Sequence, residues 1–258
     1  MKNSPVVNAK MDGASPLGET LNAAQLSAIA AGMYEDGPLL LRTLQRWRPY
    51  ICPFERLLRH VQNRSRVLDI GCGAGLLFSL MAGLGFEFEG LGVDSSKRAI
   101  DLARYMARRA AVRAPQAKLS FECLRLPAAL PCETFDAVFL IDVLHHISQR
   151  DQRRFLHRAI ARLKPGGTLV YKDMCLRPRW RAYANRLHDL VVARQWITYL
   201  PVRTLEQWAQ SEGMVVIFSE DLSRFCYGHE LRVLSRLSVP PGGPQMLHAE
   251  HNDAEAPR

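Results

Sequence analysis

Several features that define common protein classes are missing from this chain of 258 residues. None of its six cysteines forms a Cys-x-x-Cys pair, and no cluster of cysteine and histidine has zinc-site spacing. No apolar run approaches the ~20 residues of a transmembrane helix, and residues 1–19 lack the apolar core of a signal peptide. We therefore expect no metal site and no membrane span, and we expect free thiols in a reducing cytoplasm.

Two common nucleotide-binding signatures are also missing from the glycine-rich segment Gly71–Gly75. The segment has no Gly-Lys-Ser/Thr, which excludes a phosphate-binding P-loop. The dinucleotide pattern G-x-G-x-x-G requires its third glycine at the position of Leu76, but that glycine comes one residue early, at Gly75.

What the segment does have is a strand that leads into a glycine turn and then into a helix. Residues 66–70 form an apolar run typical of a buried strand, and the apolar run 76–84 after the turn predicts a helix. Backbone N–H groups at such a helix start face a ligand, and glycines let the ligand approach closely. The pattern predicts a nucleotide-type pocket at this turn.

Asp94 follows the second predicted strand, nineteen residues after Gly75. A carboxylate at this place can accept hydrogen bonds from both ribose hydroxyls of a nucleoside. An acidic residue after a strand can also be only a helix N-cap. Its combination with the glycine turn favours the ribose role.

The sequence Val-Leu-Asp-Ile-Gly-Cys-Gly-Ala-Gly, residues 67–75, resembles motif I of the class I methyltransferases that depend on S-adenosylmethionine (SAM). The resemblance implies that the turn holds the amino-acid end of SAM, that Asp69 orders the turn and orients the SAM ammonium, and that Asp94 binds the ribose. The product would be S-adenosylhomocysteine, with no metal involved. The predicted cofactor-binding residues are Asp69, Gly71, Cys72, Gly73, Gly75, Asp94, Ser95, Leu126 and Asp142.

Two further segments resemble the same superfamily, and one departs from it. Residues 135–147 resemble its fourth-strand motif, and residues 163–170, with Lys-Pro-Gly-Gly, resemble the turn into its fifth strand. The family often places an aspartate that contacts the adenine amine shortly before a Leu-Pro pair. Counting back from Leu130 and Pro131, this position holds Leu126. We therefore expect adenine to be bound through apolar contacts and backbone groups.

His145 and His146 follow the fourth predicted strand, near the place where the methyl group of SAM must point. An imidazole titrates near neutral pH, so either residue is a candidate general base. The alternative is a packing turn, which the same Leu-His-His sequence forms in many small-molecule methyltransferases.

Alternating strands and helices predict a parallel sheet flanked by helices. The resemblance implies the full architecture, an α/β, Rossmann-like class I methyltransferase fold: a mostly parallel seven-stranded sheet with helices on both faces, preceded by an N-terminal helical cap. We expect disordered tails at 1–19 and 239–258, the cap at 20–62 with a helix interrupted near Pro49 and Pro53, and the catalytic domain at 63–238. Strands are expected at 66–70, 90–93, 118–122, 136–141 and 167–172, a hairpin at 214–219 and 231–237, and core helices at 76–84, 96–112, 151–163 and 204–212.

The segment 173–203 is the predicted substrate lid, because this fold commonly carries an acceptor-covering insertion after the fifth strand. The candidate acceptor-binding residues are Asn185 and His188 on its polar face, Tyr183 on its apolar stripe and Tyr171 just before it, with His188 also a candidate base. A solvated polar face is the alternative. Residues 46–54, 171–174 and 184–190 resemble methyltransferases of bacterial aryl-polyene and related pigment pathways, which implies an aromatic or polyketide-type acceptor.

The net charge of +9 and the pI of about 9.5 favour an acidic partner. An acidic acyl carrier protein that holds the acceptor would fit, and arginines on solvated helix faces would explain the charge without any partner. DNA is not expected. An RNA methyltransferase is an alternative, although Asp142-Val143-Leu144 stands where amine-methylating nucleobase enzymes have Pro-Pro. A non-catalytic SAM-binding protein is a further alternative.

Overall fold

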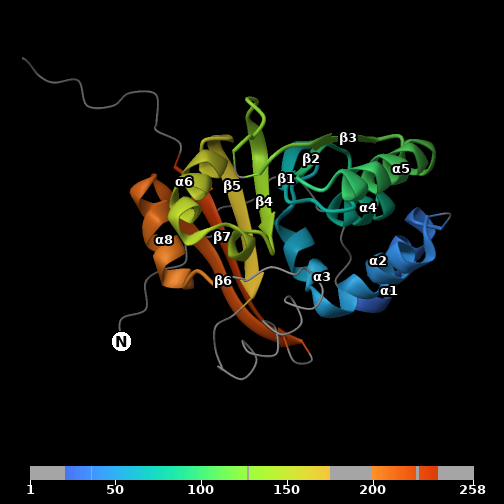
Figure 1. Ribbon diagram of the computed structural model, residues 1–258, viewed down its shortest axis with the longest axis horizontal. Helices are drawn as coiled ribbons and strands as arrows, with labels where there is room; N and C mark the ends of the chain where they lie inside the picture. The colour runs from blue at the N-terminus through green and yellow to red at the C-terminus, as the bar shows by residue number, and fades with distance from the viewer. Residues whose placement is uncertain (1–20, 36, 127, 175–198, 225–226, 238–258) are drawn as a thin grey trace, which may run out of the picture.

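A seven-stranded sheet forms the centre of the computed structural model, which describes residues 21–35, 37–126, 128–174, 199–224 and 227–237 (Figure 1). The strand order is β3-β2-β1-β4-β5-β7-β6. β7 runs antiparallel to both of its neighbours, and the pairs among the first five strands are parallel. The strands are β1 (Ser65–Ile70), β2 (Phe88–Asp94), β3 (Ala117–Cys123), β4 (Phe135–Ile141), β5 (Leu163–Met174), β6 (Met214–Arg224) and β7 (Tyr227–Arg236).

Helices cover both faces of this sheet, which confirms the predicted fold class (Figure 1). Successive residues of a strand point to opposite faces. Val67 accordingly packs in the core cluster with α4 and α5, and Leu68 packs in the cluster with α6 and α8. The helices are α1 (Ala23–Met33), α2 (Leu39–Ile51), α3 (Phe54–Leu57), α4 (Leu76–Gly83), α5 (Lys97–Arg113), α6 (Gln149–Ile160) and α8 (Val202–Ser211), with the short 3-10 helices η1 (Leu58–His60) and η2 (Leu144–His146).

The N-terminal helices pack against α4 and α5, as a cap beside the sheet's glycine turn (Figure 1). The expected interruption near Pro49 is not observed, because α2 continues through Pro49 to Ile51. The chain instead leaves the helix at Cys52, which is extended with φ −98° and ψ 132°. Cys52 precedes Pro53, and a residue before proline is driven out of the helical region by the proline ring.

The fifth strand begins earlier than the sequence predicted. Leu163 pairs with Phe135, and after a shift of register Thr168 pairs with Ala137. The Lys-Pro-Gly-Gly segment therefore forms an irregularity inside β5, with Gly166 at φ +77°, instead of a turn before the strand. The preceding helix ends at Ile160 and not at residue 163 for the same reason, since Leu163 already belongs to the sheet. The predicted hairpin is observed, with longer strands than expected.

Several predictions fall outside the described residues: the two tails and most of the insertion 173–203, including Tyr183, Asn185 and His188. Among the described residues, the helices are all too short or too polar to cross a membrane.

Candidate active site

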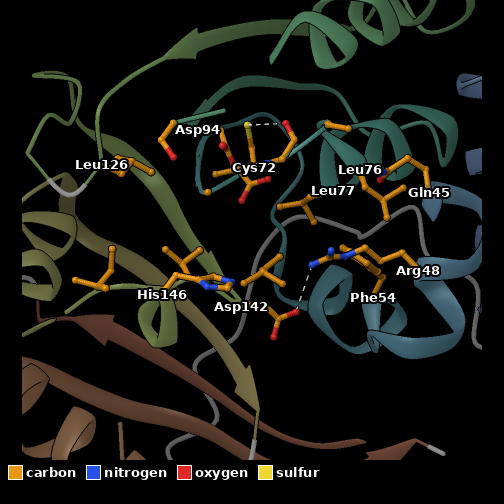
Figure 2. A pocket seen from close by; sticks show the side chains of 18 residues that line it. Gln45, Arg48, Phe54, Cys72, Leu76, Leu77, Asp94, Leu126, Asp142 and His146 are labelled. Carbon is orange, nitrogen blue, oxygen red and sulfur yellow. Dashed lines mark hydrogen bonds and ion pairs between the residues drawn. The ribbon is translucent and has the colours of Figure 1, made fainter. Parts of the chain in front are cut away.

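A cavity of about 490 Å³ opens at the carboxyl ends of β1, β2 and β4 (Figure 2). Asp94 and Leu126 lie on one side of it, and Gln45, Arg48 and Phe54 of the N-terminal helices lie on the other. Its volume is within the usual range for small-molecule and cofactor sites. The other residues that line it are Asp69, Gly71, Cys72, Gly73, Ala74, Leu76, Leu77, Ser95, Ile141, Asp142, Val143, His146 and Ile147.

Three features of this turn favour glycine: its backbone conformation, close contacts with neighbouring side chains, and open space beside the backbone. Gly71, Gly73 and Gly75 have φ of +77°, +54° and +79°, a region that other residues rarely adopt. A Cβ on Gly71 would lie 2.5 Å from Val143, and a Cβ on Gly75 would lie 2.7 Å from the ring of Phe121. At Gly73, nothing lies within 4 Å of the Cβ position. This open space beside the backbone is where a ligand can approach the turn closely, which fits the predicted cofactor.

Asp94 holds the turn in place from the neighbouring strand. One carboxylate oxygen accepts a hydrogen bond from the Gly73 N–H at 2.9 Å, and the other accepts one from the Ser96 N–H at 2.8 Å. Ser96 is the N-cap of α5 through its own side chain, which accepts from the Ala99 N–H. Asp94 therefore does not cap α5 itself. Its carboxylate lies at the cavity with further acceptor positions for ribose hydroxyls.

Asp69 lines the same cavity and is buried. The pKa of its carboxyl is raised to about 7, mainly by burial and also by the nearby Asp94 carboxylate, while Arg48 opposes this shift. A cationic ligand in the cavity would favour the ionised form, because an opposite charge stabilises a carboxylate. The negative charge of the ionised Asp69 carboxylate would suit the ammonium and sulfonium of the predicted SAM.

Asp142 lies at the end of β4 with the unusual φ of +57° for a non-glycine residue. Its carboxylate accepts a hydrogen bond from the Lys172 ammonium at 2.6 Å and contacts the Arg48 guanidinium at 3.4 Å. Burial alone would raise the pKa of the Asp142 carboxyl, but Lys172, Arg48 and His145 together hold it well below its usual range. Asp142 is therefore ionised and fixed by two cations at the cavity wall.

The two predicted histidines have different environments. His146 lines the cavity with an exposed side chain. Its pKa is lowered to about 4, first by desolvation and then by the adjacent His145. His145 is buried outside the cavity lining, and its Nδ1 lies 2.5 Å from a carboxylate oxygen of Asp173. The two rings are 4.1 Å apart, so the buried pair of His145 and Asp173 supports the ring that faces the cavity.

One group of side chains in the described residues could form a metal site by distance alone. Ligand atoms of Asp142, His145 and Asp173 lie within 4.8 Å of one another. However, the Lys172 ammonium is already bound to Asp142, and a divalent cation there would meet its charge at close range. The donor set therefore fits a buried ion-pair network better than a metal.

The remaining predicted residues are placed as follows. Cys72, Ser95 and Leu126 line the cavity, and Gly75 lies next to it as the N-cap of α4. Tyr171 does not line the cavity: it is buried in the core cluster with α6 and α8, a position that favours a packing role.

Sequence reasoning missed Gln45, Arg48 and Phe54, which close the cavity from α2 and α3. It also missed Lys172, the buried partner of Asp142. A helical cap was predicted, but no local pattern indicates which of its residues would reach the cavity. The one available signal was the charged pair Lys172-Asp173, which directly follows the apolar run 169–171.

The sheet with one reversed strand, the glycine turn and the aspartate at the end of β2 define a class I SAM-dependent methyltransferase. Residues 41–217, more than half of the chain, match a family described as a methyltransferase domain, and the chain belongs to this family.

Similar proteins agree with this assignment. The chain is 29% identical to a ubiquinone biosynthesis O-methyltransferase of Bradyrhizobium sp. (strain ORS 278), over 72% of this chain and 66% of that protein, just under two thirds of its length. It is 28% identical to a protein of the same name from Nitrobacter winogradskyi, over 81% of this chain and 79% of that protein. Magnesium protoporphyrin IX methyltransferase from Synechocystis, solved with bound S-adenosylhomocysteine, shares the fold with a TM-score of 0.58 and 17% identity, over 81% of this chain and 93% of that one.

Proposed function

We propose that this protein transfers the methyl group of SAM to a hydroxyl oxygen of a small aromatic or polyketide-type acceptor. The observation that carries the proposal is that the glycine turn, Asp94 and His146 line one cavity. Oxygen as the methylated atom is supported by the names of the similar O-methyltransferases.

The chain's own residues bind and orient the reactants in this proposal. Asp94 binds the ribose while it holds Gly73, and Asp69 faces the cationic part of the cofactor. Arg48 is the cationic residue that lines the cavity, and it suits a carboxylate such as that of SAM. Bound SAM supplies an electrophilic methyl group on a good leaving group. Catalysis then depends mainly on holding acceptor and methyl in line at short range.

His146 is the proposed proton acceptor. Its lowered pKa keeps the imidazole neutral near pH 7, with a free lone pair for the acceptor's hydroxyl proton. The same low pKa makes it a weak base, since base catalysis is most efficient when the pKa lies near the working pH. We therefore assign His146 a moderate contribution and expect positioning to provide more. His145, held by Asp173, is a positioning residue for the His146 ring.

A labelled-methyl assay tests the proposal. Protein, SAM with a labelled methyl group and a panel of phenolic and enol acceptors should give a labelled product heavier by one methylene unit. His146→Gln should lower turnover, and His157→Gln is the matched control, because His157 is exposed on α6 and pairs with Glu212. Label transferred to RNA and to no small molecule would instead support the RNA methyltransferase alternative. SAM binding without transfer to either would support a non-catalytic protein.

Two finer parts of the proposal rest on the sequence alone. The net positive charge of the chain would suit an acceptor that is carried by an acidic acyl carrier protein. Tyr183, Asn185 and His188 remain predicted acceptor-binding residues, and alanine there should lower turnover without changing SAM affinity by more than about threefold. The free thiols of Cys52, Cys72, Cys123 and Cys132 suit the cytoplasm.

A further inference from the structure

Helix α2 has an apolar face that is exposed on the outside of the molecule. The exposed fractions are 75% for Leu39, 67% for Leu40, 53% for Leu44, 56% for Trp47 and 39% for Ile51. At 3.6 residues per turn, the last four of these residues fall within an arc of about 60°. Large apolar side chains gathered in one exposed patch indicate an interaction surface.

The opposite side of α2 holds the helix to the protein. Of its thirteen residues, all of which are described, only Pro49 is buried, and it lies nearly opposite the apolar face. Gln45, which lines the cavity, also lies on the inner side, and Arg48, which lines it too, lies between Gln45 and the apolar face. Figure 1 shows α2 at the outer edge of the molecule. The apolar face therefore points away from the protein, next to the opening of the cavity.

The charge of this region favours an anionic occupant. Residues 37–54 contain Arg42, Arg46 and Arg48 and no acidic residue. Arg46 lies within about 20° of Leu39, at one border of the apolar face, whereas Arg42 lies on the same side of the helix as Pro49. If two copies of the chain met through α2, they would bring their Arg46 side chains near each other, in addition to the net charge of +9 on each copy. Repulsion between like charges argues against such a dimer.

We propose that the apolar face of α2, residues Leu39, Leu40, Leu44, Trp47 and Ile51, docks the protein on an anionic membrane surface. Helices that lie in the membrane interface combine an apolar face rich in leucine and tryptophan with arginine on the polar side. Arg46 would meet anionic headgroups, and Trp47 would lie at the headgroup level. This docking lies beyond the proposed methyl transfer and does not depend on it.

Sedimentation of the full chain with lipid vesicles tests the proposal at low ionic strength. We expect binding to vesicles that contain phosphatidylcholine and phosphatidylglycerol, and little binding to phosphatidylcholine alone. The double variant Leu40→Gln/Leu44→Gln should bind at least about tenfold more weakly, because it removes two apolar anchors. Arg46→Gln should lower binding to anionic vesicles by about fivefold, because one basic residue near the surface contributes about 1 kcal/mol. The matched control is Val215→Gln, an exposed apolar residue on the edge strand β6.

The affinity for SAM, measured by calorimetry, serves as the folding check, since none of the substituted residues lines the cavity. It also separates a failure of docking from a failure of the cofactor site. The proposal is overturned if the wild-type chain does not bind anionic vesicles, or if Leu40→Gln/Leu44→Gln binds them as well as wild type does. It is also overturned if the chain forms a dimer without lipid that this double variant loses, because the face would then be an interface between copies.

Discussion

The Asp94 carboxylate accepts a hydrogen bond from the Gly73 N–H at 2.9 Å, across 21 residues of sequence. This bond ties the end of β2 to the glycine turn after β1, so one carboxylate both shapes the turn and faces the cavity. The second oxygen of Asp94 is bound to the Ser96 N–H, which fixes the rotamer of the carboxylate. Together the two bonds fix the glycine turn and the Asp94 carboxylate relative to each other.

Asp94→Ala should lower SAM affinity by about tenfold or more, because hydrogen bonds to a charged group contribute roughly 1.5–3 kcal/mol each. The fold should survive, since Asp94 lies at the cavity and not in the core. Calorimetry with SAM measures the effect. Asp101→Ala, which removes an exposed partner of Lys97 on α5, is the control and should leave affinity unchanged. Unchanged affinity in Asp94→Ala would show that Asp94 serves only the turn.

SAM affinity should fall as the pH drops through about 7, because protonation of Asp69 removes a negative charge that faces the cationic ligand. A single linked proton limits the effect to at most tenfold per pH unit, and titrations between about pH 6 and pH 8 would measure it. Asp69→Asn should bind SAM more weakly at the upper end of this range and should lose the dependence. A wild-type affinity that is flat with pH would contradict the raised pKa.

Asp69 should also make the folded protein less stable as the pH rises, whereas it makes SAM binding stronger. Its pKa is about 7 in the folded chain against an ordinary value of 3.8 in an unfolded one, so between these pH values the folded state binds more protons than the unfolded chain. The free energy of unfolding should therefore fall as the pH rises from about 4 to about 7, by up to about 4 kcal/mol. Asp69→Asn should remove this slope in denaturant unfolding without SAM. A slope that persists in the variant would assign it to other groups.

Lys172→Met should lower the free energy of unfolding by about 3–5 kcal/mol, because it leaves the Asp142 carboxylate without its buried partner. The double variant Asp142→Asn/Lys172→Met should recover most of the loss. Lys164→Met is the control: its ammonium pairs with Asp136 at 2.8 Å, but both side chains are more than one third exposed, so its loss should cost about 1 kcal/mol or less. Equal losses of unfolding free energy in the Lys172 and Lys164 variants would show that burial does not strengthen the effect of losing the lysine.

His146→Gln should lower turnover by about tenfold to a hundredfold and leave SAM affinity unchanged. Because the His146 pKa is lowered to about 4, the variant should keep any inflection of kcat near neutral pH. A pH–rate profile for wild type and variant checks both points. If the variant loses an inflection near pH 7, His146 titrates at its ordinary pKa and its environment is more hydrated than the structure shows.

The parts of the site that lie within one short segment could be predicted from the sequence. Gly71, Gly73 and Gly75 stand together in one turn, and each has the positive φ that favours glycine. The alternation of strands and helices predicted a sheet flanked by helices, and the resemblance of the motifs predicted the particular fold class. The start of β5 was harder to predict: Lys-Pro-Gly-Gly has the composition of a turn, but pairing of Leu163 with Phe135 draws it into the sheet.

The contacts that complete the site join residues far apart in the sequence. Arg48 and Asp142 are separated by 94 residues, and Asp142 and Lys172 by 30. No local pattern encodes such pairs, because they depend on which strand lies beside which and on how the N-terminal helices fold over the sheet. Once β4 and β5 are known to be parallel neighbours, their carboxyl ends must meet, and the pairing of Asp142 with Lys172 follows.

Titration calorimetry with SAM, S-adenosylhomocysteine and NAD tests the central claim most directly. The account predicts saturable binding of SAM and S-adenosylhomocysteine at one site per chain, weakened by Asp94→Ala, with no detectable binding of NAD. Binding of NAD without binding of SAM would contradict the assignment of the glycine turn and, with it, the proposed methyl transfer.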